Sequence, residues 1–364
     1  MPNFDTIVVG GGMAGVSIAY ELAADRTVAL LDMESTLAYH TTGRSAAMFL
    51  ESYGPAAVRA LTVCSRPFLE SLDVLSPLPM LCVGGAGRGA AVERRYETVR
   101  DLAPRVRLLD GGQACELQPL LREGAVERAM LEPDATEIDV HELHQHYVRG
   151  LRARDGVVRT GAPITSARRR GGTWGLDLRG ETWAAPVVVN AAGAWADAVA
   201  AVFGARTVGL RALRRTAFIA DAPPGVGAPM IDEIDEKFYL KPEVGRVLCS
   251  PADETPQDPS DARPDELEIA RAIDAINELT TLDIRHVRSS WAGLRNFVAD
   301  RSPVAGYDAE RAGLFWFAGQ GGYGIQMAPA LARTGAALVR GEMLPGDVAA
   351  LGLTPAAISP RRLS

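Results

Sequence analysis

The fold of this 364-residue chain is decided by the stretch Thr6-Ile7-Val8-Val9-Gly10-Gly11-Gly12-Met13-Ala14-Gly15. Its four β-branched residues indicate a buried strand, and the three glycines after them indicate a tight turn. The following segment, Ala14–Ala24, carries apolar side chains at helical spacing, and Val28–Leu31 is a second short apolar run. This order predicts a βαβ unit with two parallel strands.

The glycines of this turn match the pattern G-x-G-x-x-G between a strand and a helix. Gly10 allows the tight turn, Gly12 lets a pyrophosphate approach the backbone, and Gly15 allows the helix to pack closely on the strand. The helix N-terminus favours an anion. Asp32 ends the second strand, where a carboxylate accepts hydrogen bonds from a ribose; Glu34 is the alternative acid. We predict a dinucleotide site, and the turn alone does not choose between NAD and FAD.

Composition excludes several other classes of protein. Lys and Arg number 38 and Asp and Glu 45, a net charge of −7, which argues against binding of nucleic acid through its phosphates. The four cysteines form no C-x-x-C pair, so we predict neither a disulfide framework nor a zinc site. His141, His144 and His146 lie on one predicted helix without a completing thiol or carboxylate. We interpret them as solvent-facing and predict no metal.

No segment is predicted to span a membrane. The most apolar stretch, residues 184–205, contains Pro186 and Asp197 and is better explained as a strand followed by a helix. The N-terminal segment has Asp5 where a signal peptide carries positive charge. We therefore expect a cytoplasmic protein.

The remaining pattern predicts an α/β protein in which a second domain interrupts a Rossmann-like domain. Helices are expected at Ala57–Leu72, from the N-cap Asp139 to Leu151, at Pro264–Leu279 and up to Arg340; strands are expected at Trp183–Asn190, Ala217–Ala220, Phe238–Leu240 and Leu314–Ala318. The cofactor domain is predicted to comprise residues 1–77, 138–207 and 302–364. Residues 78–137 and 208–301 are predicted to form an inserted substrate domain of the α+β type with an antiparallel sheet.

Four further segments resemble one family. They are Tyr39–Ala47, Val189–Trp195, Trp291–Arg295 and Ala318–Gln326. Together with the glycine turn they resemble the FAD-dependent D-amino-acid oxidase superfamily, and within it the D-arginine dehydrogenases. The resemblance covers nearly the whole chain and implies an FAD-binding domain, noncovalent FAD and a D-amino acid substrate. His40 gives no indication of covalent attachment.

The resemblance and the chemistry of these segments assign residues to the cofactor. Hydroxyl groups, small side chains and backbone donors at a helix start suit a pyrophosphate and a flat ring. The predicted cofactor residues are Gly10, Gly12, Met13, Ala14, Gly15, Asp32, Met33, Thr41, Thr42, Gly43, Arg44, Ser45, Ala46, Ala47, Met48, Ala192, Gly193, Trp195, Gly321, Gly322, Tyr323, Gly324, Ile325 and Gln326.

A carboxylate anchor is expected for the substrate, and arginine matches a carboxylate with two hydrogen bonds. Arg295 ends a buried-strand pattern, where an unpaired cation is costly; a salt bridge to Asp300 or Asp283 is the structural alternative. Arg215 matches the family's second arginine, although Arg214 beside it leaves the choice open.

The resemblance adds further residues to the substrate site. Tyr239 is expected to face away from the core side of its strand and to support the carboxylate. Tyr53 matches an active-site tyrosine of the family, and the carbonyl of Gly322 is expected to receive the substrate amine.

The implied reaction is oxidative deamination, in which hydride leaves the α-carbon for the flavin and the imine is hydrolysed to a 2-oxo acid and ammonia. No pocket histidine or carboxylate is evident as a base. The resemblance implies that an acid for a cationic side chain would lie in the segment 77–82, and this segment carries none. Met48 suits apolar groups, so apolar D-amino acids are favoured; Glu51 is the acid that would reverse this. The alternatives are an FAD oxidase of glycine, sarcosine or D-proline, a nicotinamide-dependent dehydrogenase, and an inactive flavin module. The electron acceptor is left open between a quinone, oxygen and another compound.

Overall fold

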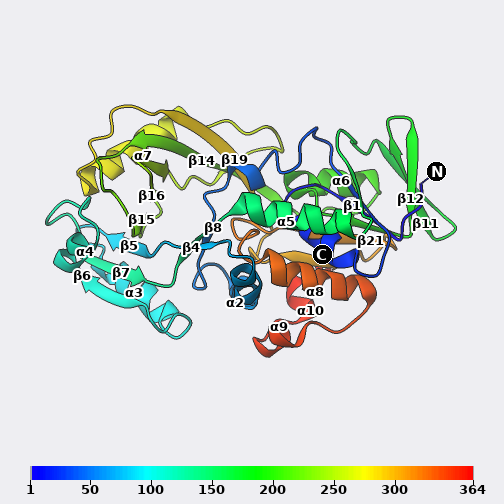
Figure 1. Ribbon diagram of the computed structural model, residues 1–364, viewed down its shortest axis with the longest axis horizontal. Coiled ribbons are helices and arrows are strands. Elements are labelled where there is room, and N and C mark those ends of the chain that lie inside the picture. The colour runs from blue at the N-terminus through cyan, green and yellow to red at the C-terminus, as the bar shows by residue number, and fades with distance from the viewer. Residues whose placement is uncertain (1, 364) are drawn as a thin grey trace.

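The computed structural model describes residues 2–363 and contains two large sheets, one of six and one of nine strands. Figure 1 shows the two sheets at different positions along the longest axis, so that the molecule is elongated. Elements from the two halves of the chain contribute to each sheet. Each large sheet is therefore built from segments that lie far apart in the sequence.

The six-stranded sheet has the order β20-β21-β13-β1-β2-β9. All neighbouring strands are parallel except β20 and β21. The strands are β1 (Thr6–Val9), β2 (Val28–Leu31), β9 (Val157–Arg159), β13 (Val187–Asn190), β20 (Val304–Tyr307) and β21 (Leu314–Ala318). The βαβ unit predicted from the N-terminal stretch is confirmed by the parallel pairing of β1 with β2.

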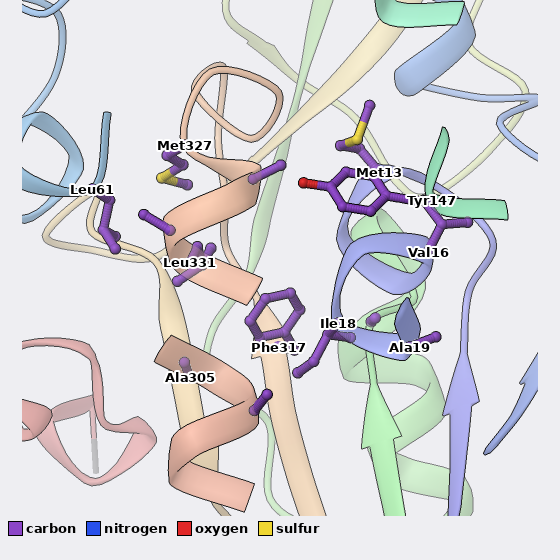
Figure 2. Packing of buried hydrophobic residues seen from close by; sticks show 14 of the residues in the cluster. Met13, Val16, Ile18, Ala19, Leu61, Tyr147, Ala305, Phe317, Met327 and Leu331 are labelled. Carbon is purple, nitrogen blue, oxygen red and sulfur yellow. The ribbon is translucent and has the colours of Figure 1, made fainter. Parts of the chain in front are cut away.

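Both faces of this sheet are covered, which explains why its strands are apolar runs rather than alternating patterns. One face packs against the helices α1 (Met13–Leu22), α5 (Val140–Ala153) and α8 (Ala328–Arg340). Figure 2 shows Phe317 of β21 between Ile18 of α1 and α8. The other face packs against a three-stranded sheet of β10 (Ser166–Arg170), β11 (Thr173–Leu178) and β12 (Glu181–Ala185).

The nine-stranded sheet is antiparallel except for one parallel pair, β5 with β15. Its strands are β5 (Met80–Gly84), β6 (Arg107–Asp110), β7 (Arg128–Glu132), β14 (Arg211–Asp221), β15 (Met230–Glu233), β16 (Tyr239–Glu243), β17 (Arg246–Ser250), β18 (Thr255–Pro256) and β19 (Ser289–Phe297). On one face, residues such as Phe218 and Leu240 pack against α4 (Gly111–Leu117) and α7 (Glu266–Leu279). The opposite face packs in part against α3 (Gly89–Val99), through Cys82 and Met130, and in part lines a cavity.

A small sheet connects the two parts of the molecule. It consists of β3 (Met48–Phe49), β8 (Thr136–Ile138) and β4 (Leu75–Pro77), and it lies between the two large sheets in Figure 1. The other helices are α2 (Ala56–Ser71), α6 (Ala196–Val202), α9 (Gly346–Ala350) and α10 (Pro355–Ile358), with short 3₁₀ turns at Thr42–Arg44, Gly193–Trp195 and Pro360–Leu363.

The prediction of one strand over Trp183–Asn190 is wrong. The segment holds two strands, because β12 pairs with β11 while β13 pairs with β1 and β21. Pro186 separates them, and a proline cannot donate to a continuous ladder. The residue boundaries of the two domains remain a prediction.

Candidate active site

A cavity of about 380 Å³ lies at the carboxyl ends of the parallel strands. The turns after β1, β2, β13 and β21 line it, together with residues of β14 and β19 on the nine-stranded sheet. The crevice beyond the carboxyl ends of such strands is the usual binding place in an open α/β sheet. The segments that the sequence assigned to the cofactor therefore meet around one space.

The glycine turn is tightly packed against its neighbours. Gly10 has a φ of +110°, and a Cβ atom there would lie 2.4 Å from the carbonyl oxygen of Ala191. A Cβ atom on Gly15 would lie 1.7 Å from the carbonyl oxygen of Gly10, which explains why the helix needs glycine at that contact. Thr42 accepts a hydrogen bond through Oγ1 from the amide of Met13 at 3.0 Å, so its hydroxyl fixes the loop to α1.

Asp32 lines the cavity and is held by backbone donors. The Gly11 amide donates to Oδ2 at 2.5 Å and the Glu34 amide donates to Oδ1 at 2.7 Å. Burial raises the pKa of this carboxyl, against the opposing effect of the two hydrogen bonds. On the other side of Gly11, Nε2 of His144 lies 3.0 Å from its carbonyl oxygen. The prediction of a solvent-facing His144 is wrong, because this side chain is only 3% exposed and contacts the glycine turn.

Most of the predicted cofactor residues line the larger cavity. They are Gly10, Gly12, Met13, Ala14, Asp32, Met33, Thr41, Thr42, Arg44, Ser45, Ala46, Ala192, Gly193, Trp195, Gly321, Gly322, Gly324 and Ile325. Ala47, Met48 and Gln326 instead line a smaller adjoining cavity. Gly15, Gly43 and Tyr323 belong to neither lining. Tyr323 is buried against Tyr53 and Phe297, with ring centroids 4.8 and 5.9 Å apart.

The positively charged guanidinium of Arg44 forms hydrogen bonds with groups of the protein itself. Its Nη1 donates to the carbonyl oxygens of Ala262 and Ala292, at 3.2 and 2.9 Å, and its Nη2 donates to Asp261. The guanidinium therefore anchors the loop to the substrate side of the molecule. Thr41 has a similar role, since its hydroxyl donates to the carbonyl oxygen of Leu294 at 2.7 Å.

The smaller cavity has a volume of about 110 Å³ and shares several wall residues with the larger one. Arg215, Tyr239, Arg295 and Gly322 line both cavities, and Tyr53 lines the smaller one. All five residues predicted for the substrate thus lie around one junction between the cavities.

The register of β14 and β19 explains how two arginines reach this junction. Leu213 pairs with Arg295 and Arg215 pairs with Gly293, and residues two apart on paired strands share a face of the sheet. Arg214 points to the opposite face, where it donates to Asp253 at 3.0 Å and Asp265 at 2.9 Å. Of the two neighbouring arginines, Arg215 is therefore the one that lines the cavities.

Tyr239 follows the same alternation. Its neighbours Phe238 and Leu240 are fully buried in the core beneath the sheet, while Tyr239 lines the cavities. This orientation is the one predicted from the sequence.

Arg295 has no carboxylate within ion-pair distance among residues 2–363. The acids considered as structural partners are engaged elsewhere, Asp300 with Arg362 and Asp283 with Arg285. Arg295 donates to the Tyr53 hydroxyl at 3.4 Å. A Cβ atom on Gly322 would lie 3.0 Å from the Arg295 guanidinium, so glycine there leaves room for this arginine. Nearby, burial and the charge of Arg295 lower the pKa of Arg215.

These features fit a bound flavin dinucleotide: the cavity wall holds the start of α1, many glycines and alanines, and the arginines Arg44, Arg215 and Arg295. A family model described as FAD dependent oxidoreductase matches residues 5–338. The chain belongs to this FAD-dependent oxidoreductase family. Its cofactor is FAD, and the nicotinamide-dependent alternative is overturned by the family match.

Relatives agree with this assignment along nearly the whole chain. Glycine oxidase from Geobacillus kaustophilus (strain HTA426) is 25% identical over 372 residues, covering 97% of each chain. The crystal structure of that organism's glycine oxidase has a TM-score of 0.84 at 24% identity, covering 97% of this chain and 99% of the other. L-Proline dehydrogenase from P. horikoshii has a TM-score of 0.84 at 19% identity, covering 100% and 98%. This chain is therefore an FAD-dependent oxidoreductase.

The wall of the smaller cavity is partly apolar. Met48, Leu50, Met80 and Met230 contribute to it. Glu51 takes no part in this lining, because it accepts from Nε of Arg66 at 2.6 Å.

Charged groups also line this wall, contrary to the prediction of a pocket without a carboxylate. Asp232 and Glu236 are present, with Asp232 bonded to Arg95 at 2.9 Å. These acids could not be predicted from the sequence, because β15 lies beside β5 in space but far from it along the chain. Lys241 lines the cavity too and is paired with Glu137 and Glu243.

Two further parts of the larger cavity were not predicted. Ala162, Pro163 and Ile164 line it, and the amide of Ala162 donates to the carbonyl oxygen of Asp32 at 2.8 Å. A short strand after α5, which continues the βαβ order, was the signal that pointed to them. Asn296 also lines the cavity and keeps a buried Oδ1 without a partner in the described chain.

Within residues 2–363, no helix is both long and apolar enough to cross a lipid bilayer.

Proposed function

We propose that this flavoenzyme oxidises D-amino acids to 2-oxo acids and ammonia. The observation that supports the proposal best is the pair of arginines, Arg215 and Arg295, at the junction of the two cavities. Both side chains are cations, and within the described chain no carboxylate is paired with Arg295. This arrangement suits a ligand that brings its own carboxylate. FAD, when bound, supplies the acceptor for the hydride that leaves the substrate.

The chain's own residues would hold the substrate at both ends. Arg215, Arg295 and Tyr239 fix the carboxylate, with Tyr53 supporting Arg295 through its hydroxyl. Gly322 lies directly beside Arg295 and offers a carbonyl oxygen to the amine. Such orientation contributes strongly to the rate, because the reacting carbon is held in one position. Asp232 is neutralised by Arg95, so deprotonation of the amine before binding supplies the lone pair that assists hydride departure.

The side chain is proposed to be apolar. Met48, Met80 and Met230 support this, since unbranched thioether side chains adapt to apolar groups of different shape. Asp232 and Lys241 contribute charges that are already paired, and Glu236 is exposed to solvent, so these groups offer little to a charged side chain.

Kinetics on a substrate panel tests the proposal. The purified holoenzyme is mixed anaerobically with D-methionine, D-leucine, D-phenylalanine, D-arginine, D-lysine and the L-enantiomers, and bleaching of the flavin absorption is followed. Apolar D-amino acids are expected to react fastest. D-Arginine as the best substrate by tenfold or more contradicts the apolar preference, and reaction with L-enantiomers alone contradicts the whole proposal.

A second candidate function is oxidation of glycine or an N-substituted glycine. It is supported by the likeness to glycine oxidase over 97% of both chains and by the small volume, about 110 Å³, of the side-chain cavity. Glycine and sarcosine added to the same panel separate the two candidates. Bleaching by glycine or sarcosine at least tenfold faster than by D-methionine favours the second.

A further inference from the structure

One carboxylate outside the cavity linings, Glu254, bonds Arg215 of the site and Arg301 outside it. Glu254 follows β17 and precedes β18. Its Oε1 accepts from Nη2 of Arg215 at 3.3 Å, and its two oxygens accept from Arg301 at 2.7 and 2.9 Å. Burial opposes ionisation of Glu254, but Arg301, Arg215 and Arg295 together lower the pKa of its carboxyl. Glu254 is therefore an ionised group shared by arginines.

Arg215 depends on this contact for its orientation. Its side chain is only 11% exposed, and Nε is buried without a hydrogen-bond partner in the described residues. Glu254 is the one acid bonded to Arg215 within residues 2–363. A long side chain with one anchor loses its preferred position when that anchor is removed.

The other partner of Glu254 reaches the turn that carries Gly322. The guanidinium of Arg301 lies 3.8 Å from the centre of the Phe297 ring. This ring fills the space beside Gly321, where a Cβ atom would lie 2.2 Å from it, and the Gly321 amide donates to the Asn296 carbonyl at 2.9 Å. Glu254 is thus connected to the carboxylate end of the substrate site and, through Arg301, to its amine end.

We propose that Glu254 is a positioning residue that holds Arg215 in place for the substrate carboxylate. This rests on the proposed function, in which Arg215 binds that carboxylate. Removal of Glu254 has two opposed effects on an anion: the pocket gains net positive charge, which favours binding, and Arg215 loses its anchor, which disfavours binding. Arg301 is 43% exposed, so solvent screens much of the charge that it would leave uncompensated, and we expect the loss of the anchor to dominate.

Two substitutions separate charge from anchoring. Glu254→Gln keeps an oxygen that accepts from Arg215 and removes the charge, whereas Glu254→Ala removes both. The probe is benzoate, a carboxylate whose binding to the holoenzyme is followed by the change in flavin absorption. Glu254→Ala is expected to raise the benzoate Kd and the substrate KM about tenfold while kcat stays within about twofold. Glu254→Gln is expected to bind benzoate within about threefold of the wild-type affinity.

A double variant and a matched control complete the test. In the Arg215→Ala background, Glu254→Ala is expected to add less than a twofold change, because the residue through which it acts is absent. Asp265→Ala, which removes a partner of the outward-facing Arg214, is expected to leave the benzoate Kd unchanged. Flavin content and Tm of each variant report the folded fraction.

Four results overturn the inference. Tighter benzoate binding in both Glu254 variants shows an effect of charge alone. Equal weakening with and without Arg215 shows that Glu254 does not act through that residue. If Arg215→Ala weakens benzoate binding and Glu254→Ala leaves it intact, Glu254 has no positioning role, while the proposed function stands. If the wild-type enzyme does not bind benzoate, both the inference and the proposed function are contradicted.

Discussion

At the residue scale, the site depends on which side of a strand each arginine occupies. Arg215 and Arg214 are adjacent, yet one lines the cavities and the other bonds Asp253 and Asp265 on the opposite face. Alternation along a strand converts this one-residue difference into different functions. The pair therefore offers an internal control for any experiment on carboxylate binding.

Arg295→Ala is predicted to keep FAD but to lose most of the activity. Loss of one charged hydrogen-bond partner of the substrate costs about 2 to 4 kcal/mol of transition-state stabilisation, or roughly 30-fold to 1000-fold in kcat/KM. Arg215→Ala is expected to lose less in the same direction. Arg214→Ala should lower the stability of the protein and leave kcat/KM near the wild-type value. Near-normal kcat/KM in a folded Arg295→Ala protein would contradict the assignment.

Glu132 gives a pH-dependent prediction. It is 3% exposed and accepts from the Ser52 hydroxyl at 2.6 Å, and burial raises the pKa of its carboxyl. A raised carboxyl pKa means that the folded state prefers the protonated form, so stability is present at low pH and decreases as pH rises through the folded pKa. Glu132→Gln keeps an acceptor for Ser52 and removes this loss.

The difference in Tm between Glu132→Gln and wild type is therefore expected to be small near pH 4 and to grow in favour of the variant toward pH 8. Thermal unfolding across this range measures it. Exposed Glu123, substituted in the same way, serves as the control. A variant that becomes less stable than wild type as pH rises would show that the charge of Glu132, through Arg95, outweighs its burial.

The kinds of residue at the site were predictable from the sequence, but the directions of several side chains were not. Short motifs predicted that Thr41, Thr42 and Arg44 lie at the larger cavity, but the polar atoms of these side chains form hydrogen bonds with Leu294, Met13 and Ala292. Those partners lie far away along the chain, so no local pattern indicates them. Burial of His144 depends in the same way on a contact with Gly11.

At the element scale, the strongest predictions came from periodicity and caps. The helix predicted from the N-cap Asp139 to Leu151 is α5, in which Leu143, Tyr147, Val148 and Leu151 are buried. The strand over 183–190 was misjudged because two apolar strands of different sheets follow each other across Pro186. Local hydrophobicity does not say which sheet a strand joins.

Gly15→Ala is predicted to disrupt the packing of α1 on β1. The new Cβ atom would lie 1.7 Å from the Gly10 carbonyl oxygen, and overpacking of this kind costs about 1 to 3 kcal/mol or more. Because the same backbone forms the cofactor turn, FAD content is expected to fall with Tm. Gly346→Ala, where no atom lies within 4 Å of the new Cβ, should change neither. Full FAD content and an unchanged Tm in Gly15→Ala would contradict this packing argument.

At the scale of the whole molecule, the site exists because two sheets from interleaved chain segments face one cavity. The six-stranded sheet supplies the glycine turn, and the nine-stranded sheet supplies Arg215, Tyr239 and Arg295. Sequence patterns predicted both layers, but the parallel pairing of β5 with β15 joins residues about 150 positions apart. Contacts of that range determine where Asp232 lies, and a single sequence does not reveal them.

A buried lysine links the nine-stranded sheet to the small sheet beside the cavity. Lys241 of β16 is 4% exposed and donates to Glu137 of β8 and to Glu243, the latter at 2.8 Å. Lys241→Met keeps much of the volume but leaves two carboxylates near each other. Breaking a buried pair costs about 3 to 5 kcal/mol, and since both acids are 40% exposed we expect about 1 to 3 kcal/mol after screening by solvent.

Denaturant unfolding of Lys241→Met measures this cost. Lys237, the other lysine of the chain, is exposed, and Lys237→Met is expected to be neutral. Adding Glu137→Gln to Lys241→Met removes the unpaired charge and should recover part of the lost stability, because repulsion between the carboxylates is the cause. If Lys241→Met is as stable as wild type, or if the second substitution lowers stability further, the ion pair does not hold the two sheets together and apolar packing around Met48 and Met80 must do so.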